Sequence, residues 1–435
     1  MIPTTVFRKT AVFLAVIFAA SFGADVSARD ARAAHTHRRL APASAAPAPP
    51  KSDAGMPAVA GDANAAARDF NRWLDSVEQS EQISGMAAVI VKDDRVLLQR
   101  GVGFADASQQ RPVTPDSVFR LASLSKAFAT ALTGLLVDEG MLSWDTHVAG
   151  VLPTFELKDG DASSKLTVRD ILSQRAGLPH NTYDTLLEQD APYEELVEKL
   201  RDVPMACNVG DCYGYQNVAF SLIGDITYAV SGDFFYHLVE KRLFHPLGMD
   251  TATYGRVALE ASADWAKPHS HRGRSWVPIP IKESYYHVPP AAGVNASIRD
   301  MGKWLIAQMG GRPEVLPQEL LTTLHTPLVE TPIERHFTPW RKARLRSANY
   351  ALGWRVYDYA GQTLVFHAGA VQGYRSMIAF LPEQRFGAVM LWNCECALPS
   401  GLMPMLLDRY LGLGEVDWAG LETPKRSRLV AGGSH

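Results

Sequence analysis

Hydrophobic positions early in the chain change from a helical to a strand period. A first set of apolar residues recurs at helical spacing within residues 64–81: Phe70, Trp73, Leu74 and Val77. Residues 85–103 then alternate or run apolar on both sides of a polar turn, as in a β-hairpin. The pattern therefore predicts a helix followed by a two-stranded unit.

Further along, residues 121–139 form a long stretch with one apolar face, and Gly140 follows it as a C-terminal cap. Helical patterns then dominate to about residue 311, and a final helix is expected at 402–413. A series of strand patterns precedes that helix: 350–359, 363–367, 374–381 and 386–393. Sheet elements at both ends that enclose a helical middle predict an α/β (α+β) fold with one discontinuous sheet and an inserted helical lobe.

Residues 1–28 have the pattern of an export signal. Two basic residues precede an apolar stretch at 11–22, and small residues at 26–28 suit cleavage before Arg29. An uncleaved membrane anchor is the alternative, but the stretch is shorter than the roughly 20 residues that cross a bilayer. We therefore expect an exported protein, periplasmic or secreted, with no membrane span after cleavage.

Three further parts follow the signal. Residues 29–66 are rich in alanine and proline without an apolar period, so we expect a disordered linker. Residues 67–413 carry the folded domain, and residues 414–435 form a polar C-terminal tail. The domain divides into two sheet parts and the helical lobe between them: about 67–118, 350–413 and 119–349.

The composition is that of an ordinary globular protein, and the net charge of −3 gives no reason to expect a nucleic-acid partner. The four cysteines suit two bridges in an oxidising compartment, and their spacing does not fit a zinc site. We favour a local Cys207–Cys212 bridge over cross-pairing, although a bond between Cys394 and Cys396 would be strained. The three pairings of four thiols stay open.

Ser123 stands three residues before Lys126, a spacing that occurs nowhere else in the chain. On a helix this spacing puts both side chains on one face, so the amine can touch the hydroxyl that it must activate. Lysine can act as the base if burial or nearby positive charge disfavours its ammonium form. An isolated pair of this kind would be a helix cap and a solvated face, so further motifs decide its meaning.

Tyr215-Gln216-Asn217 is the second motif, and it precedes a helical pattern at 218–230. Free tyrosine titrates near pH ~10, so beside a lysine ammonium the Tyr215 phenolate becomes accessible and can move protons between the serine and a leaving group. The Asn217 amide can donate to a substrate carbonyl and hold the lysine. Alone, Tyr215 would be a packed surface aromatic.

His367-Ala368-Gly369 is the third motif, and it lies between two strand patterns. The glycine lets a substrate lie close to the strand edge, and the N–H of Ala370 would complete an oxyanion hole with that of Ser123. His367 would hydrogen-bond or electrostatically steer a substrate carboxylate. Without the other two motifs it would be a structural histidine.

The three motifs, in this order, resemble those of the serine β-lactamase and penicillin-binding D,D-peptidase superfamily, most closely its class C and D,D-carboxypeptidase branch. Phrases at 166–179, 246–249 and 290–300 also resemble this superfamily, and the similarity spans about 64–413. The resemblance implies an antiparallel sheet flanked by helices with an inserted all-helical lobe. It also implies two-step acyl transfer through an acyl-serine, without a metal or an organic cofactor.

The resemblance assigns a role to each motif residue. Ser123 is the acylated nucleophile, Lys126 its proton partner and Tyr215 the general base and acid. Asn217 contacts the substrate and the lysine, and His367 is the third-strand residue. The expected partner is a small-molecule or peptide substrate with an amide or ester group.

Departures from the superfamily pattern keep the substrate open. Many β-lactamases carry a threonine where this chain has Ala368, and the threonine hydroxyl binds the β-lactam carboxylate. His-x-Gly is more usual in carboxypeptidase, aminopeptidase and esterase members. β-Lactamase-like or D-Ala-D-Ala carboxypeptidase-like hydrolysis, a carboxylesterase of the same fold and a non-hydrolytic sensor all stay open. A Cys207–Cys212 bridge would rigidify the rim before Tyr215.

Two other segments mimic the motifs. Ser347-Ala348-Asn349 follows a basic run where we expect a connecting loop, and His271-Arg272-Gly273 has no strand pattern before it. We reject both as catalytic. His269 and His271 lack further ligands for a metal site, so we expect polar surface residues there. The sequence does not indicate an oligomeric state.

Overall fold

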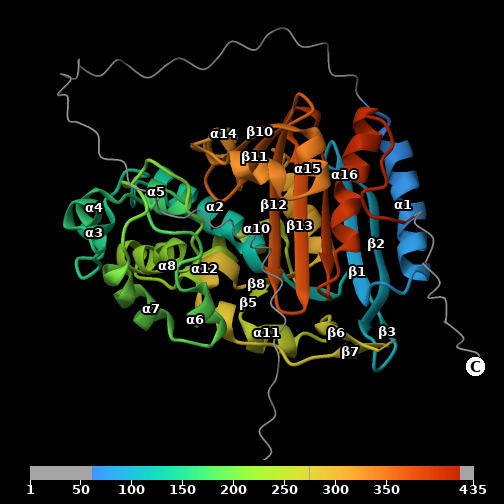
Figure 1. The fold of residues 1–435 in the computed structure, drawn as a ribbon, viewed down its shortest axis with the longest axis horizontal. Helices are drawn as coiled ribbons and strands as arrows, with labels where there is room; N and C mark the ends of the chain where they lie inside the picture. Colours follow the sequence, from blue (N-terminus) through green and yellow to red (C-terminus); the bar gives the residue numbers. More distant parts are fainter. Residues whose placement is uncertain (1–60, 274, 422–435) are drawn as a thin grey trace, which may run out of the picture. The chain divides into compact units, whose positions relative to one another are not determined.

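The computed structural model describes residues 61–273 and 275–421. The strands of its main sheet are β1 (Gly85–Lys92), β2 (Arg95–Asp106), β3 (Arg111–Pro112), β9 (Val329–Glu330), β10 (Leu345–Tyr350), β11 (Arg355–Tyr359), β12 (Gln362–Val371), β13 (Tyr374–Leu381) and β14 (Phe386–Trp392). Within the described residues these nine strands pair antiparallel in the order β3-β2-β1-β14-β13-β12-β11-β10-β9 (Figure 1). The sheet is discontinuous in sequence, because β1 pairs with β14.

The two faces of the sheet bury different hydrophobic clusters. Along β1, Met86, Ala88 and Ile90 face one cluster, and the residues between them face the other, as the two-residue period of a strand requires. Helices α1 (Ala63–Gln79) and α16 (Leu398–Leu411) cover the first face (Figure 1). Helices α2 (Ser125–Asp138) and α13 (Ile298–Gln308) contribute to the cluster on the second.

The segment between β3 and β9 forms a mainly helical lobe. Its other helices are α3 (Val148–Val151), α4 (Gly160–Lys165), α5 (Val168–Leu172), α6 (Asp184–Glu188), α7 (Tyr193–Lys199), α8 (Val218–Ser231), α9 (Phe235–Val239), α10 (His245–Leu247), α11 (Arg256–Ala261), α12 (Pro289–Ala292) and α14 (Gln318–His325). Helix α15 (Pro339–Arg344) follows β9. The lobe is not all helical, since it includes two small sheets. They are formed by β4 (Val118–Arg120), β8 (Val294–Ser297) and β5 (Thr253–Tyr254), and by β6 (His269–Arg272) and β7 (Ser275–Pro278).

Several predicted bounds move by a few residues. Helix α1 begins at Ala63, inside the expected linker, because the Asp62 carboxylate caps it by accepting from the Ala65 N–H at 2.9 Å. The main sheet resumes at β9 rather than at residue 350. The expected tail is not wholly peripheral: the Trp418 indole donates to Asp408 at 2.9 Å. The expected signal at 1–28, most of the linker and residues 422–435 lie outside the described residues.

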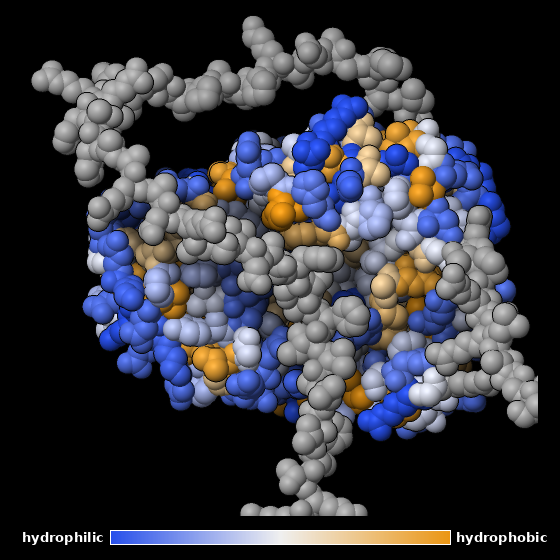
Figure 2. Space-filling view, in the orientation of Figure 1, coloured by the Kyte–Doolittle hydropathy of each residue, from blue (hydrophilic) through white to orange (hydrophobic). Residues whose placement is uncertain are grey.

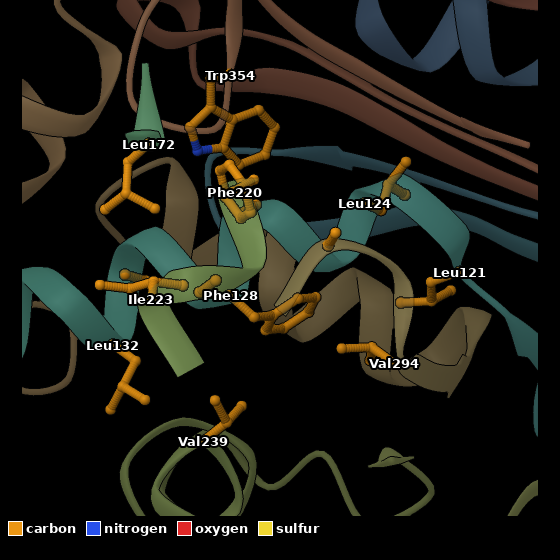
Figure 3. Close-up of a cluster of buried hydrophobic side chains, with 14 of the residues drawn as sticks. Leu121, Leu124, Phe128, Leu132, Leu172, Phe220, Ile223, Val239, Val294 and Trp354 are labelled. Carbon is orange, nitrogen blue, oxygen red and sulfur yellow. The ribbon is translucent and has the colours of Figure 1, made fainter. Parts of the chain in front are cut away.

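Helix α2 is the centre of the lobe core. Figure 3 shows Phe128 and Leu132 along it and Leu124 just before it, with Phe220 and Ile223 of α8 pointing into the same cluster. All five side chains are buried. Hydrophobic burial therefore fixes α2, which begins two residues after Ser123, against α8, which begins directly after Asn217.

Both disulfides in the described residues are local. Cys207 pairs with Cys212, as expected, and Cys394 pairs with Cys396 at a Cα separation of 5.3 Å. That Cα separation lies within the ordinary range for a disulfide, and the expectation of a strained bond stays a prediction.

Hydrophilic side chains cover much of the visible surface of the lobe, and hydrophobic ones lie in small separate areas (Figure 2). Among residues 61–273 and 275–421, no single helix is long and apolar enough to cross a membrane. The pair Val218–Ser231 and Phe235–Leu247 reaches that length and hydropathy only together, across a bend of 83°.

Candidate active site

Ser123 lies on a single 3-10 turn, Ala122–Leu124, between β4 and α2. Ala122 has φ +51°, a left-handed conformation that is rare and costly for a residue with a side chain. Contacts on both sides hold this turn: the Leu121 N–H donates to Val294 O at 2.9 Å, and the Ser376 hydroxyl donates to Leu121 O at 2.6 Å. The strained turn leaves Ser123 partly exposed while its neighbours are buried.

Lys126 lies one turn further along, and its side chain is fully buried. Its Nζ lies 3.5 Å from Ser123 Oγ, 2.7 Å from Asn217 Oδ1 and 3.2 Å from the Ala291 carbonyl oxygen. Burial lowers the pKa of the amine to about 7, although the nearby Asp184 carboxylate opposes that shift. A lysine can act as the base when burial disfavours its ammonium form, and Lys126 meets this condition.

Tyr215 lies beside both groups. Its ring centroid is 4.7 Å from Lys126 Nζ, and its hydroxyl hydrogen-bonds with Ser123. Burial raises the Tyr215 pKa well above its usual value, and the hydrogen bond from Ser123 opposes this only in part. The expectation of an accessible phenolate is therefore wrong, because burial outweighs the nearby positive charge. The neutral phenol can still pass a proton, since it donates and accepts at once.

Asn217 joins the lysine to a carboxylate that the motifs do not include. Its Nδ2 donates to Asp184 Oδ2 at 2.8 Å, while its Oδ1 accepts from Lys126. Burial raises the Asp184 pKa to about 6, although the Asn217 hydrogen bond and the Lys126 charge lower it. Expected contacts of Asn217 with a substrate stay a prediction.

His367 lies on β12 and is almost fully buried. Its Nδ1 is 2.8 Å from the Ala368 carbonyl oxygen, so Nδ1 carries the proton, and its Nε2 is 3.4 Å from the Tyr350 hydroxyl. Burial and the Arg355 charge hold the His367 pKa well below its usual value, so the ring is neutral. These contacts favour a positioning role, and the expected contact with a substrate carboxylate stays a prediction.

Gly369 brings β12 against the serine turn. A Cβ built at Gly369 would lie 2.3 Å from Ser376 Oγ, 2.4 Å from Leu121 O and 3.1 Å from Ser123 N. Only a residue without a side chain permits this approach. Ala370 follows, exposed and opposite Arg375 of β13. Gly369 therefore lets the backbone of β12 lie beside the serine turn. The expected oxyanion hole from the Ala370 and Ser123 N–H groups stays a prediction.

A buried ion cluster supports the tyrosines of the site. The Arg355 guanidinium lies 5.7 Å from the Tyr215 ring and 5.6 Å from the Tyr350 ring, and it pairs with Glu334. Glu334 also pairs with Arg341. The sequence analysis missed this cluster, because its members come from three separate elements and no fixed spacing relates them to the motifs.

The competing motifs lie elsewhere in the fold. Ser347 is exposed on strand β10 rather than in the expected loop. His271 is exposed on β6, so the expectation that no strand accompanies it is wrong. His269 is buried rather than on the surface, and its Nε2 accepts from the Ala107 N–H at 3.0 Å. No group of three metal-ligating side chains occurs among the described residues.

This antiparallel sheet with its mainly helical lobe, and the serine and buried lysine where they meet, define an active-site-serine hydrolase fold. The chain belongs to the beta-lactamase family, whose model matches residues 74–399. The superfamily and the fold class expected from the motifs are confirmed.

Similar proteins are distant in sequence. The chain is 26% identical to "Unguisins hydrolase ungD'" of Aspergillus campestris, over 81% of this chain and 67% of the relative. It is 24% identical to "Protein flp" of Staphylococcus aureus, over 78% of this chain and 66% of the relative.

Solved structures support the same fold. The octameric penicillin-binding protein homologue from Pyrococcus abyssi has a TM-score of 0.71 and 23% identity, over 80% of this chain and 78% of its own. The class C beta lactamase from Rhodobacter sphaeroides has a TM-score of 0.62 and 23% identity, over 80% and 99%. At these identities the likeness is one of fold.

Proposed function

We propose that this chain is a serine hydrolase that cleaves small amides or esters through an acyl-enzyme on Ser123. The observation that carries the proposal is the buried Lys126 amine, 3.5 Å from Ser123 Oγ, with its pKa lowered to about 7. Near neutral pH a large fraction of this amine is uncharged and can accept the serine proton.

The contacts suggest one proton path. As Ser123 Oγ bonds to the acyl carbon, its proton passes to the Lys126 nitrogen. The neutral Tyr215 phenol, which contacts both groups, then relays a proton to the leaving amine or alcohol. Water then attacks the acyl carbon and gives a proton to Lys126, and as the ester bond to Ser123 breaks, that proton passes to the released serine oxygen.

The site favours esters without a carboxylate over β-lactams. A β-lactam carries a carboxylate, and a cation or hydroxyl beside the third strand would stabilise it. Here His367 is neutral and Ala368 has no hydroxyl. We therefore expect weak turnover of β-lactams.

Three substrates test the proposal: a short-chain nitrophenyl ester, a D-Ala-D-Ala peptide and a chromogenic cephalosporin. We expect product from the ester or the peptide and a transient acyl adduct, seen by intact-mass measurement, that Ser123→Ala abolishes. A stable adduct without product would indicate a sensor instead. Product at an unchanged rate from Ser123→Ala would overturn the proposal.

We also propose that the enzyme acts outside the cytoplasm. The two disulfides of the described chain suit an oxidising compartment, and the N-terminal residues match an export signal. Cell fractionation, with N-terminal sequencing of the mature protein, tests this. Recovery of the full-length chain from the cytoplasm alone would contradict it.

A further inference from the structure

Asp184 is a carboxylate beside the site to which neither the motifs nor the family match gives a role. We propose that Asp184 is a positioning residue: it fixes the Asn217 amide so that its oxygen faces Lys126 and the lysine lone pair is directed at Ser123. This inference rests on the proposed function and states how that function's base is oriented.

The argument begins with the symmetry of an amide. The oxygen and nitrogen of Asn217 have nearly the same shape, so packing alone does not choose between two orientations. A carboxylate only accepts hydrogen bonds, and Asp184 Oδ2 lies 2.8 Å from Asn217 Nδ2. The flipped amide would place oxygen against oxygen there. Asp184 therefore selects the orientation in which Oδ1 faces the lysine.

The consequence appears in the neutral form of the lysine. An uncharged amine has two N–H groups and one lone pair. Two acceptors lie within reach of Lys126 Nζ, Asn217 Oδ1 at 2.7 Å and the Ala291 carbonyl at 3.2 Å. When these take both N–H groups, the lone pair is left for the third neighbour, Ser123 Oγ. A flipped amide would offer N–H to the same nitrogen and engage the lone pair.

The backbone ties Asp184 to the catalytic tyrosine. The Asn181 N–H donates to Tyr215 O at 2.7 Å, and the Tyr215 N–H donates to His180 Nδ1 at 3.0 Å. The Asp184 N–H in turn donates to Asn181 O at 3.1 Å. The carboxylate is thus held in register with Tyr215 and Asn217.

Other charged and titratable groups face this pair. Around Lys126 they are Arg355 on β11, Tyr215 before α8 and His367 on β12, and around Asp184 they are Glu188 on α6 and Tyr285 before α12. Arg355 lowers the lysine pKa, while Asp184 raises it. Glu188 raises the pKa of Asp184. Removing the Asp184 charge therefore lowers the lysine pKa.

Two substitutions separate orientation from charge. Asp184→Asn keeps an oxygen that accepts from Asn217 and removes the charge. Asp184→Ala removes both. The control is Asp225→Asn on α8: the Asp225 carboxylate also accepts a side-chain hydrogen bond, from the Tyr193 hydroxyl at 2.7 Å, and makes no contact with the lysine.

The first readout is the rate of Ser123 acylation by a nitrophenyl ester. We expect Asp184→Ala to lower it about 10- to 100-fold, a fraction of what general-base catalysis contributes, with little change in ester binding. Asp184→Asn should restore only part of the rate, because its own amide can present either oxygen or nitrogen to Asn217, and it should move the acid limb of the pH profile to lower pH. Asp225→Asn should behave as the unmodified protein.

The second readout is the Lys126 pKa, measured by NMR on isotopically labelled lysine in the full chain. It should fall in Asp184→Asn and stay constant in Asp225→Asn. An Asp184→Ala protein with an unchanged acylation rate, or an unchanged lysine pKa in Asp184→Asn, would overturn the inference. If the unmodified protein acylates no substrate, the proposed function fails, and the NMR titration still decides the inference.

Discussion

Lys126 makes stability and activity oppose each other at one residue. Its amine is fully buried, and burial lowers its pKa from the ordinary 10.5 to about 7. Between these values the unfolded chain binds a proton that the folded chain releases, so this group makes stability rise with pH from about 7 to 10.5. Burial of Lys126 therefore lowers the stability of the fold at neutral pH, and it supplies the uncharged amine that the chemistry requires.

Lys126→Met should remove this cost. Methionine fills a similar volume without a charge, so we expect a higher Tm than that of the unmodified protein, with the larger gain at pH 7 and a smaller one at pH 10. Turnover should fall by about a thousandfold because the base is gone. Thermal unfolding at both pH values and an ester assay test this. A lower Tm at pH 7 would show that the lysine contacts stabilise more than burial costs.

Tyr215 and Ser347 test the second motif against its competitor. Tyr215→Phe removes the hydroxyl that contacts Ser123 but keeps the ring, so we expect turnover to fall about a hundredfold with a similar Tm. Ser347 is exposed on β10, so Ser347→Ala should leave both unchanged. Steady-state kinetics of the two variants decide the assignment, and a loss only in Ser347→Ala would reverse it.

At the residue scale the sequence supplied the motif residues but not what surrounds them. Ser123 and Lys126 share a helix turn, and a spacing of three is enough to place them together. Asp184 and Asn217 lie 33 positions apart in the sequence, and no periodic pattern relates them. The Tyr215 phenolate was wrongly expected because the depth of burial depends on the whole packed site.

At the element scale, alternation predicts strands well when one pattern continues over many residues. The hairpin at 85–103 and β13 lie where the sequence placed them. Strand β10 was missed because Arg346 and Ser347 interrupt its apolar pattern with exposed residues. The 3-10 turn at Ser123 was read as the first turn of α2, since local propensity does not reveal that β8 and β13 hold Leu121.

Gly369→Ala tests the contact between β12 and the serine turn. The new Cβ would lie 2.4 Å from the Leu121 carbonyl oxygen, a backbone atom that cannot turn aside. We expect β12 to move away from Ser123, so that kcat falls at least about tenfold and the Tm drops by several degrees. Gly150→Ala is the control, because nothing lies within 4 Å of its added carbon. Unchanged kcat in Gly369→Ala would show that the spacing of these strands does not govern the chemistry.

At the scale of the whole molecule, the fold depends on segments from both ends of the described chain. Strand β1 pairs with β14, and α1 packs with α16 over the face of the sheet opposite the lobe. The lobe core and the sheet core share β1, whose alternate residues serve both. Sequence patterns predicted these elements one by one, but the pairing of β1 with β14 joins residues about 300 positions apart and is not visible in any local window.

Truncation tests which residues this architecture needs. The two large clusters are built from residues between Ala63 and Tyr410, with Trp418 and Leu421 packed against one of them. A chain of residues 61–421 should therefore keep the Tm and the ester kinetics of the full chain. A chain that begins at Ser80 loses α1 and exposes the face that Phe70 covers. Each large apolar side chain buried by α1 contributes about 1.5–3 kcal/mol, and their sum approaches the whole stability of a typical domain. We expect the shorter chain to lack a cooperative transition in circular dichroism, and a folded, active product from it would show that α1 is dispensable to the sheet.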